Sequence, residues 1–128
     1  MTSVEVPYSI AAALPTLAVL DITNEVARQV RSLGAVDGIA FVTPTAESSL
    51  VRVNERESGF FQDLEELLGR IVSTDAKHRE RLLLLLLGPR TEQVPYQGGA
   101  LCLGQWQRVM LFGLGDPSRF DWQLTLIG

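Results

Sequence analysis

The chain has 128 residues, of which 46% are hydrophobic and 20% are charged, and its net charge at pH 7 is −4. The length is near the commonest domain size and the composition is that of a globular protein, so we predict one domain over residues 1–128 and exclude a disordered chain. The acidic balance argues against a nucleic-acid partner, and the apolar run Leu82–Leu87 is far too short to cross a membrane.

The sequence also bears on the cellular compartment. No basic segment precedes an apolar one near the first residue, so we expect no secretory signal. Cys102 is the only cysteine and cannot form an internal disulfide, and its apolar neighbours predict a small core residue. Both observations favour a reducing cytoplasm.

The first third of the chain predicts two strands and a helix. Residues 3–9 alternate apolar and polar side chains, and the proline among them favours an edge position because it cannot donate to a ladder. Residues 10–20 predict a loop followed by a short strand. A helix then begins near Asp21 or Thr23, with Thr23 a suitable N-cap, and ends at Gly34. The side chains expected to form its buried stripe are Ile22, Val26, Val30 and Leu33.

Two further strands precede a second helix. Residues 38–42 and 51–55 are predicted strands, and the loop between them covers residues 43–49. Asn54 and Glu55 end the second of these strands. Polar side chains at that position either face a site or cap the next helix, and the pattern leaves both readings open.

The period changes to that of a helix over residues 58–72. Its wide apolar face consists of Phe60, Phe61, Leu64, Leu67, Leu68, Ile71 and Val72. Asp63 lies at the margin of this face, where it is either solvated or directed along the buried edge and in need of a partner. The six leucines at 82–87 predict a third helix, which Gly88 and Pro89 end. Its all-round apolarity leads to the hypothesis that another subunit covers one side.

The stretch Gly98–Phe112 joins two apolar segments at Gly104 and places Trp106 between two glutamines. Such a pattern forms either the wall of a binding site or an ordinary core hairpin with a half-buried tryptophan. Residues 94–99 before it are a predicted turn, and residues 120–126 alternate strictly and predict the last strand. Strands and helices follow one another without strict β–α–β alternation, so we predict an α+β fold.

The residue types exclude several kinds of site. His78 is the only histidine and no serine lies in an elbow motif, which argues against a nucleophile–His–acid triad. One histidine and one distant cysteine do not make a zinc site, and no phosphate-binding glycine loop is present, so we predict no metal and no cofactor. The candidate acids are Glu55, Asp63 and Asp116, and Arg119 is a candidate to pair with an acid or bind an anion.

An ordered set of motifs covers nearly the whole chain. Its members are Asp21-Ile22-Thr23-Asn24-Glu25-Val26, Val53-Asn54-Glu55, Asp63, Leu87-Gly88, Val94-Pro95, Gly99, Leu103-Gly104-Gln105-Trp106-Gln107 and Asp116-Pro117-Ser118-Arg119. With these motifs the chain resembles the YjbQ family, which is similar in activity to a weak thiamine phosphate synthase. The resemblance implies an α+β fold with a mixed or antiparallel sheet, a compact homotrimer and a site between subunits.

The chain departs from the family pattern in its histidines. Where the family carries a His-Thr-Thr or His-Thr-Ser run, this chain has Ala46-Glu47-Ser48, and Arg79 and Arg81 stand at the two histidine positions of an Asn-x-His-x-His pattern. The comparison therefore implies that the histidine-based metal or anion site of the family is lost. The site residues that it implies are retained are Asn54, Glu55, Asp63, Gly99, Trp106, Gln107 and Arg119.

Three functional hypotheses follow. The leading one is a divergent YjbQ-like homotrimer that binds a small anionic ligand of the phosphate type at an intersubunit site, without metal. Its expected ligand-binding residues are Asn54, Arg79, Arg81, Gly99, Trp106, Gln107 and Arg119. The second is a weak thiamine-phosphate synthase-type transferase with Glu55 and Asp63 as acid and base. The third is a structural or partner-binding homotrimer with no small ligand.

Overall fold

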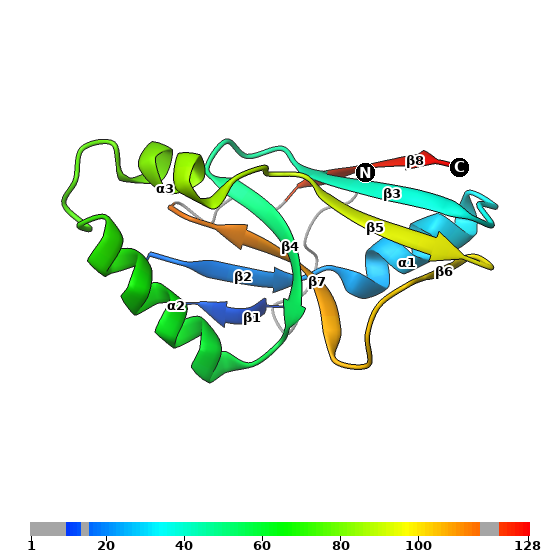
Figure 1. Ribbon diagram of the computed structural model, residues 1–128, viewed down its shortest axis with the longest axis horizontal. Coiled ribbons are helices and arrows are strands. Elements are labelled where there is room, and N and C mark those ends of the chain that lie inside the picture. Colours follow the sequence, from blue (N-terminus) through cyan, green and yellow to red (C-terminus); the bar gives the residue numbers. More distant parts are fainter. Residues whose placement is uncertain (1–9, 14–15, 116–120) are drawn as a thin grey trace.

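The computed structural model describes residues 10–13, 16–115 and 121–128, in which the chain forms eight strands and three helices (Figure 1). In chain order these are β1 (Ile10–Ala13), β2 (Ala18–Asp21), α1 (Thr23–Ser32), β3 (Gly38–Pro44), β4 (Ser49–Glu55), α2 (Ser58–Ile71), α3 (Arg79–Leu87), β5 (Glu92–Gln97), β6 (Ala100–Leu101), β7 (Gln107–Gly113) and β8 (Trp122–Ile127). The predicted strand over residues 3–9 lies outside the described residues.

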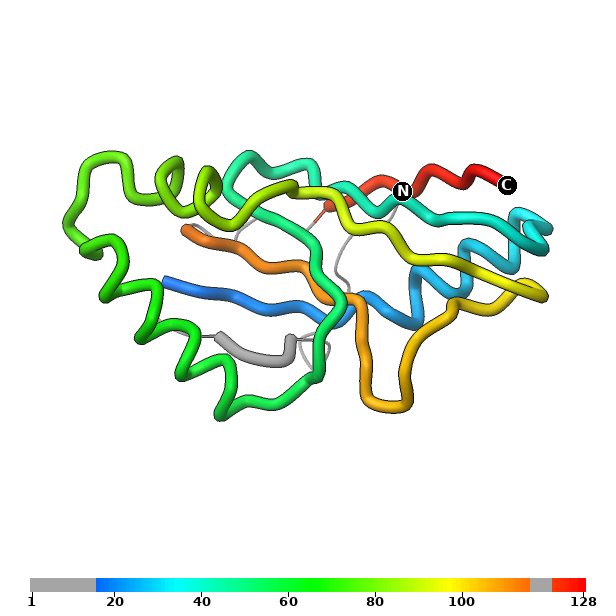
Figure 2. Tube along the Cα trace, viewed as in Figure 1, coloured from blue at the N-terminus to red at the C-terminus, as the bar shows by residue number. Residues whose placement is uncertain are grey.

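The strands form two antiparallel sheets of four strands each. One has the order β1-β2-β7-β4 and the other the order β6-β5-β3-β8. The first cluster of core residues comes from both sheets and from α1, so the two sheets pack against each other with α1 beside them. A second cluster joins the other face of the first sheet to α2 and α3, which lie along it (Figures 1 and 2). The predicted α+β fold is confirmed.

Strand β7 lies at the centre of this arrangement, between β2 and β4. Side chains alternate along a strand, so Val109 and Leu111 enter the core between the sheets, while Met110 and Phe112 enter the core under the helices. Burial on both faces explains why this part of the sequence is an uninterrupted apolar run.

Helix α1 begins at Thr23, one of the two predicted starts, but Thr23 is its first residue and Ile22 is its N-cap. The Thr23 hydroxyl makes no cap and instead accepts the N–H of Val109 at 2.7 Å. The hydroxyl that was predicted to cap the start of α1 is therefore used in a contact with β7. At the other end Gly34 has a φ of +69°, as expected for the glycine that ends a helix. The expected stripe is buried at Val26 and Val30, whereas Leu33 is exposed.

Helices α2 and α3 bury less of their apolar surface than their patterns predict. Phe61 and Leu68 of α2 and Leu83 of α3 are buried against the first sheet. The exposed apolar side chains of the two helices are Phe60, Leu67, Ile71, Leu82, Leu85 and Leu86. A sheet can cover only one side of a helix, which explains why part of each wide apolar face stays open.

The stretch around Gly104 is not a hairpin, because β6 pairs with β5 in one sheet and β7 pairs with β2 and β4 in the other. The predicted turn over residues 94–99 was too long: β5 continues to Gln97, and only Gly98 and Gly99, with φ of +61° and +79°, form the turn. Positive φ at both central residues is typical of the two-residue turn that joins antiparallel strands.

The prediction that Cys102 is a core residue was wrong, since its side chain is exposed. Leu101 and Leu103 on either side pack against the core between the sheets. Alternation along an extended chain then directs the side chain between them outward.

The edge of β4 is closed by the segment that follows α3. The Val51 N–H donates to the carbonyl of Arg90 at 2.9 Å, and the Val53 N–H donates to a carboxylate oxygen of Glu92 at 2.8 Å. The Arg52 guanidinium also donates to the Leu87 carbonyl at the end of α3. These bonds join α3 and β5 to β4, the edge strand of the first sheet.

The connection between β3 and β4 is shorter than the predicted loop over 43–49, since β3 runs to Pro44 and β4 begins at Ser49. The Arg90 guanidinium donates to the carbonyls of Pro44, Ala46 and Ser49. One cation therefore holds the ends of both strands and the turn between them.

In the described part of the chain, no helix has the length and apolarity needed to cross a membrane.

Candidate functional site

A buried carboxylate gathers polar side chains where β2 meets α1. The side chain of Asp21 is 3% exposed, and its Oδ1 accepts the N–H and the hydroxyl of Thr23 at 3.0 and 2.7 Å. Its Oδ2 accepts Nε of Arg108 at 2.8 Å and lies 3.3 Å from Nη1 of Arg56. Arg108 also reaches Oδ1 of Asn24 at 3.4 Å. The cluster ties β2, α1, β7 and the segment after β4 together.

The pKa of Asp21 is lowered from its ordinary value of 3.8. Burial acts in the opposite direction, because it disfavours the charged form. The hydrogen bonds from Arg108 and Thr23, together with the positive charge of Arg108, outweigh that effect. Asp21 is therefore a carboxylate at neutral pH, and its role is to hold the two arginines and the start of α1 in place.

The predicted residues at the end of β4 lie beside those at the start of β7. Asn54 is opposite Arg108 in the register, and Glu55 is opposite Gln107. The Gln107 side chain accepts the Gly104 N–H at 2.7 Å, and the backbone N–H of Gln107 donates to the Gly104 carbonyl at 3.1 Å, which closes the turn before β7. Trp106 lies in this turn with 69% of its surface exposed, so the alternative of a core hairpin with a half-buried tryptophan is wrong.

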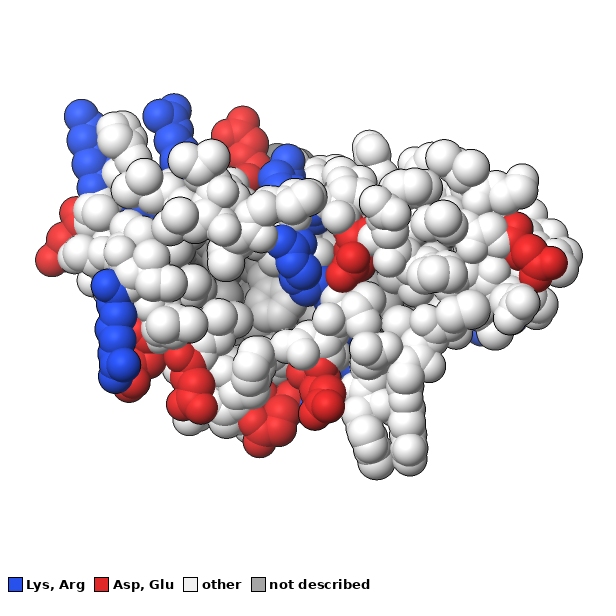
Figure 3. Space-filling view, viewed as in Figure 1, with Lys and Arg blue, Asp and Glu red and all other residues white. Residues whose placement is uncertain are grey.

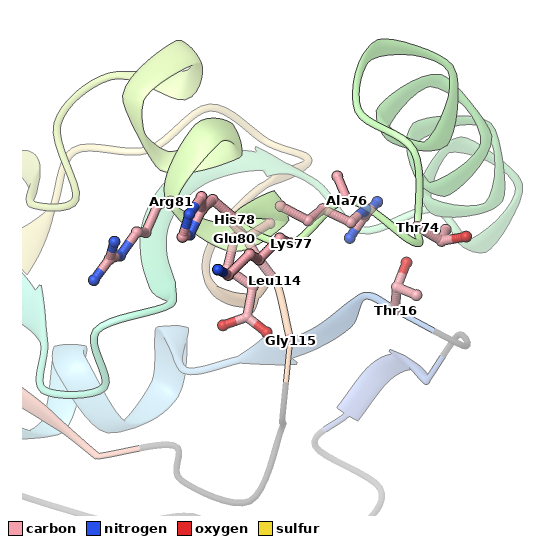
Figure 4. A pocket seen from close by; sticks show the side chains of 10 residues that line it. Thr16, Thr74, Ala76, Lys77, His78, Glu80, Arg81, Leu114 and Gly115 are labelled. Atoms are coloured by element: carbon pink, nitrogen blue, oxygen red, sulfur yellow. The ribbon is translucent and has the colours of Figure 1, made fainter.

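A second group of predicted residues lines a pocket of about 480 Å³ at the start of α3 (Figure 4). The residues that line it are Thr16, Thr74, Ala76, Lys77, His78, Arg79, Glu80, Arg81, Leu114 and Gly115. Figure 4 shows the two threonines at one end of the pocket and Arg81 at the other. The lining carries three cations and one acid, so it favours an anion.

Arg79 is the buried cation of this pocket, with 7% of its surface exposed. Its Nε donates to the Val72 carbonyl at 3.3 Å, while its Nη2 is buried and has no hydrogen-bond partner. Among the described residues, no carboxylate lies within 4 Å of its guanidinium nitrogens. A guanidinium does not give up its proton, so this charge stays in the protein interior with its hydrogen-bonding capacity partly unused.

One protomer does not bring the two groups together. The pair Glu55–Gln107 and the pair Ser49–Gly113 are six residues apart along β4 and β7, which corresponds to about 20 Å. The pocket of Arg79 lies beyond the second pair, at Leu114 and Gly115. A single intrachain site that contains all the predicted residues is therefore excluded.

The remaining predicted residues lie apart from both groups. Asp63 is exposed on α2, so the solvated reading of this residue is correct. The Gly99 N–H donates to the Val36 carbonyl at 2.9 Å and the Gly98 N–H donates to Oδ1 of Asp37 at 3.0 Å, so the segment before β3 takes both amides of the turn. Arg119 lies outside the described residues. In the parts of the chain that the structure describes, no three His, Cys, Asp or Glu side chains gather as a metal site would require.

The sequence reasoning did not single out Asp21, Arg56 or Arg108 as a cluster. Asp21 and Arg108 are 87 positions apart, and only the pairing of β2 with β7 brings them together. One available signal was the short interval between a strand and a helix start, where an aspartate commonly accepts backbone N–H groups. It would have identified Asp21 but neither arginine.

Comparisons with known proteins agree with this architecture. The family described as UPF0047 protein YjbQ-like matches residues 13–128. A UPF0047 protein of Archaeoglobus fulgidus is 33% identical over 109 residues, which cover 77% of this chain and 82% of the relative. A UPF0047 protein of Methanothermobacter thermautotrophicus is 31% identical over 118 residues, which cover 85% of this chain and 82% of the relative.

Solved structures show the same fold. The crystal structure of a hypothetical protein from Aeropyrum pernix K1 has a TM-score of 0.79 and 26% identity, and the match covers 91% of this chain and 92% of that one. A YbjQ-like protein of unknown function from Sulfolobus solfataricus P2 has a TM-score of 0.79 and 24% identity, with 91% of each chain covered.

Proposed function

Because this chain belongs to the UPF0047 protein YjbQ-like family, we propose for it a function within that scaffold: it binds a small anionic ligand of the phosphate type in the pocket around Arg79, without a metal ion. The observation that carries the proposal is the buried guanidinium whose Nη2 has no partner. An oxyanion in the pocket would accept from this nitrogen and would neutralise the charge.

The energetics favour an oxyanion over a neutral ligand. An unpaired charge in a protein interior costs several kcal/mol, and part of that cost is recovered when a counter-charge binds. Arginine presents its N–H groups in a fixed fork that matches a phosphate or a carboxylate. Lys77 and Arg81 add positive charge to the pocket, and Glu80 offsets one of the three charges.

The size and lining of the pocket favour an organic phosphate over a bare ion. A volume of about 480 Å³ lies within the range of small-molecule sites, about 300 to 1,000 Å³. Thr74 supplies a hydroxyl group at the end opposite Arg81 (Figure 4), and the Thr16 hydroxyl beside it, which donates to Glu65, can accept a hydrogen bond there. The ligand class is therefore a phosphate ester whose remaining part carries hydrogen-bonding groups.

The proposal includes self-association into a homotrimer with the site between subunits. The exposed apolar side chains on α2 and α3 support it, because contiguous exposed apolar surface is typical of an interface. The alternative of a weak thiamine-phosphate synthase-type transferase assigns the chemistry to Glu55 and Asp63. Both carboxylates are exposed in the protomer, and ligand binding by Arg79 requires neither.

Calorimetric titration tests the binding proposal. The probes are inorganic phosphate and glycerol 3-phosphate, a phosphate ester with hydroxyl groups, added to the wild type, to Arg79→Met and to Arg70→Met. Arg70 is the matched control, because its guanidinium is exposed and pairs with Glu66 on the same helix. We expect Arg79→Met to weaken binding about 10- to 100-fold, the usual weight of a hydrogen bond to a charged group, and Arg70→Met to leave it unchanged.

Two results would contradict the proposal. One is the absence of saturable binding of either probe to the wild type at millimolar concentration. The other is equal binding by the wild type and Arg79→Met, which would place the anion elsewhere on the protein.

A further inference from the structure

The pocket of Arg79 contains an acid as well as its cations. Glu80 follows Arg79 in the first turn of α3 and lines the same pocket (Figure 4). Within the residues that the structure describes, its carboxylate makes no hydrogen bond, and no arginine or lysine nitrogen lies within 4 Å of it. An unpaired carboxylate among three cations is free to interact with whatever binds in the pocket.

The backbone after β7 makes room for this carboxylate at Gly115, which also lines the pocket. A Cβ atom at Gly115 would overlap the Glu80 carboxylate. The φ of Gly115 is not positive, so the need for space, rather than an unusual backbone conformation, explains the glycine. Gly115 therefore allows the Glu80 carboxylate to lie at the wall of the pocket.

The charges that line the pocket balance one phosphoryl group. Lys77, Arg79 and Arg81 carry three positive charges and Glu80 carries one negative charge, so the formal charge of the lining is +2 with His78 neutral. A phosphate monoester carries about −1.5 to −2 at neutral pH, which this lining compensates. A second anionic group on the ligand would exceed the balance.

The pocket is also small enough for Glu80 to act on any part of the ligand. A volume of about 480 Å³ corresponds to a width of about 10 Å, roughly one Debye length at 0.1 M salt. Salt therefore screens a charge in the pocket from Glu80 only in part. Acidic and basic side chains are interspersed over the end of the molecule that carries α2 and α3, on the face seen in Figure 3, so selection of a ligand depends on individual groups.

We propose that Glu80 determines the specificity of this pocket: it restricts the ligand to phosphate esters that carry no second negative charge and that donate a hydrogen bond to its carboxylate. This inference rests on the proposed function, because it takes the binding of an anion at Arg79 as given. An ionised acceptor strengthens the hydrogen bond from a ligand hydroxyl, and the same charge repels a ligand carboxylate or second phosphate. The ligand class is a hydroxylated monophosphate ester.

Two probes of matched size test the proposal on the full chain. Glycerol 3-phosphate and 3-phosphoglycerate share the phosphate ester and the central hydroxyl, but the second carries a carboxylate in place of the terminal hydroxymethyl group. Calorimetric titration with each gives the ratio of the two dissociation constants, in which the contribution of the shared phosphate cancels. We expect the wild type to bind glycerol 3-phosphate at least about 10-fold more tightly, as for repulsion between two charges in a partly solvated pocket.

The Glu80→Gln variant removes the charge and keeps the size of the side chain. We expect its ratio of dissociation constants to fall to about one, chiefly because 3-phosphoglycerate binds more tightly. Glu66→Gln is the matched control, because the Glu66 carboxylate is exposed and pairs with Arg70 on α2. Its ratio should equal that of the wild type.

A substitution at Gly115 tests the position of the carboxylate without changing any charge. Gly115→Ala should displace the Glu80 carboxylate and lower the ratio as Glu80→Gln does, and in the Glu80→Gln background it should have no further effect. Gly69→Ala is the control, because a Cβ atom at Gly69 meets open space.

The possible failures distinguish this inference from the proposed function. If neither probe binds to the wild type at millimolar concentration, both are overturned. If glycerol 3-phosphate binds but the wild type shows no preference for it, the anion site stands and the role of Glu80 is refuted. A preference that persists in Glu80→Gln would assign the specificity to another group and would also refute that role.

Discussion

The Asp21 carboxylate joins β2 to α1 and β7, and its replacement tests how much these contacts stabilise the fold. We consider Asp21→Asn, which preserves the shape of the side chain and removes its charge. The new amide can still accept from Thr23 through its oxygen, but its nitrogen meets the Nε–H of Arg108 as donor against donor. Arg56 loses the same partner at 3.3 Å.

The magnitude follows from the exposure of the partners. Asp21 is 3% exposed, whereas the side chains of Arg108 and Arg56 are 33% and 45% exposed and regain water when their partner is lost. A hydrogen bond to a charged group is worth about 1.5 to 3 kcal/mol, which we assign to Arg108. A half-exposed ion pair contributes at most about 1 kcal/mol, which we assign to Arg56. We expect a loss of about 3 kcal/mol, or about 10 °C in Tm for a domain of this size.

Urea denaturation at several pH values is the assay, with the exposed Asp75→Asn as control. The pKa of Asp21 is lowered in the folded protein, so the carboxylate contributes its full stabilisation above the ordinary value of 3.8 and loses it as the pH falls through the folded value. The difference between the wild type and Asp21→Asn should stay constant from about pH 7 to about pH 5 and shrink below about pH 4. A difference under about 0.5 kcal/mol at pH 7, or one that grows as the pH falls, would refute this reasoning.

Three further substitutions test separate parts of the structure. Without an anion, Arg79→Met should stabilise the protein by about 1 kcal/mol in urea denaturation, because an unpaired buried charge is replaced by an apolar side chain; a loss of stability would contradict the unpaired state. Arg90→Met removes three hydrogen bonds to carbonyls and should lower the free energy of unfolding by about 2 kcal/mol. An unchanged value would mean that the β3–β4 turn is stable without these bonds. If Glu55 and Asp63 act as acid and base, Glu55→Gln and Asp63→Asn should lower formation of thiamine phosphate from the pyrimidine diphosphate and the thiazole phosphate at least about 100-fold; equal rates would remove these roles.

Local pattern was sufficient for most of the secondary structure. The helical period predicted α2, the leucine run predicted α3, and the alternation at Val51 and Val53 predicted β4. Each of these signals lies within a few residues and needs no knowledge of the rest of the chain. The family motifs then supported the fold class as a whole.

The candidate site was less predictable, because its contacts cross between strands that are distant in sequence. Pattern alone placed Cys102 in the core and left Trp106 either in a site wall or half-buried in a hairpin, and both are exposed where the chain passes from one sheet to the other. The expected site between subunits includes Arg79 and Glu55, and within one protomer the pocket of Arg79 and the Glu55–Gln107 pair lie at opposite ends of β7. Strand register decides such distances, and register is a tertiary property.

The closed edge of β4 has a consequence for how the sequence can change over time. Two amides of this strand depend on acceptors from residues 90–92, one of them a backbone carbonyl and the other a carboxylate. A deletion or insertion of one residue between α3 and β5 would move the Arg90 carbonyl out of place, and part of the edge strand β4 would be left unpaired and open to neighbouring molecules. We therefore expect this connection to keep its length in functional descendants of the chain, and the exposed turns elsewhere to tolerate insertions.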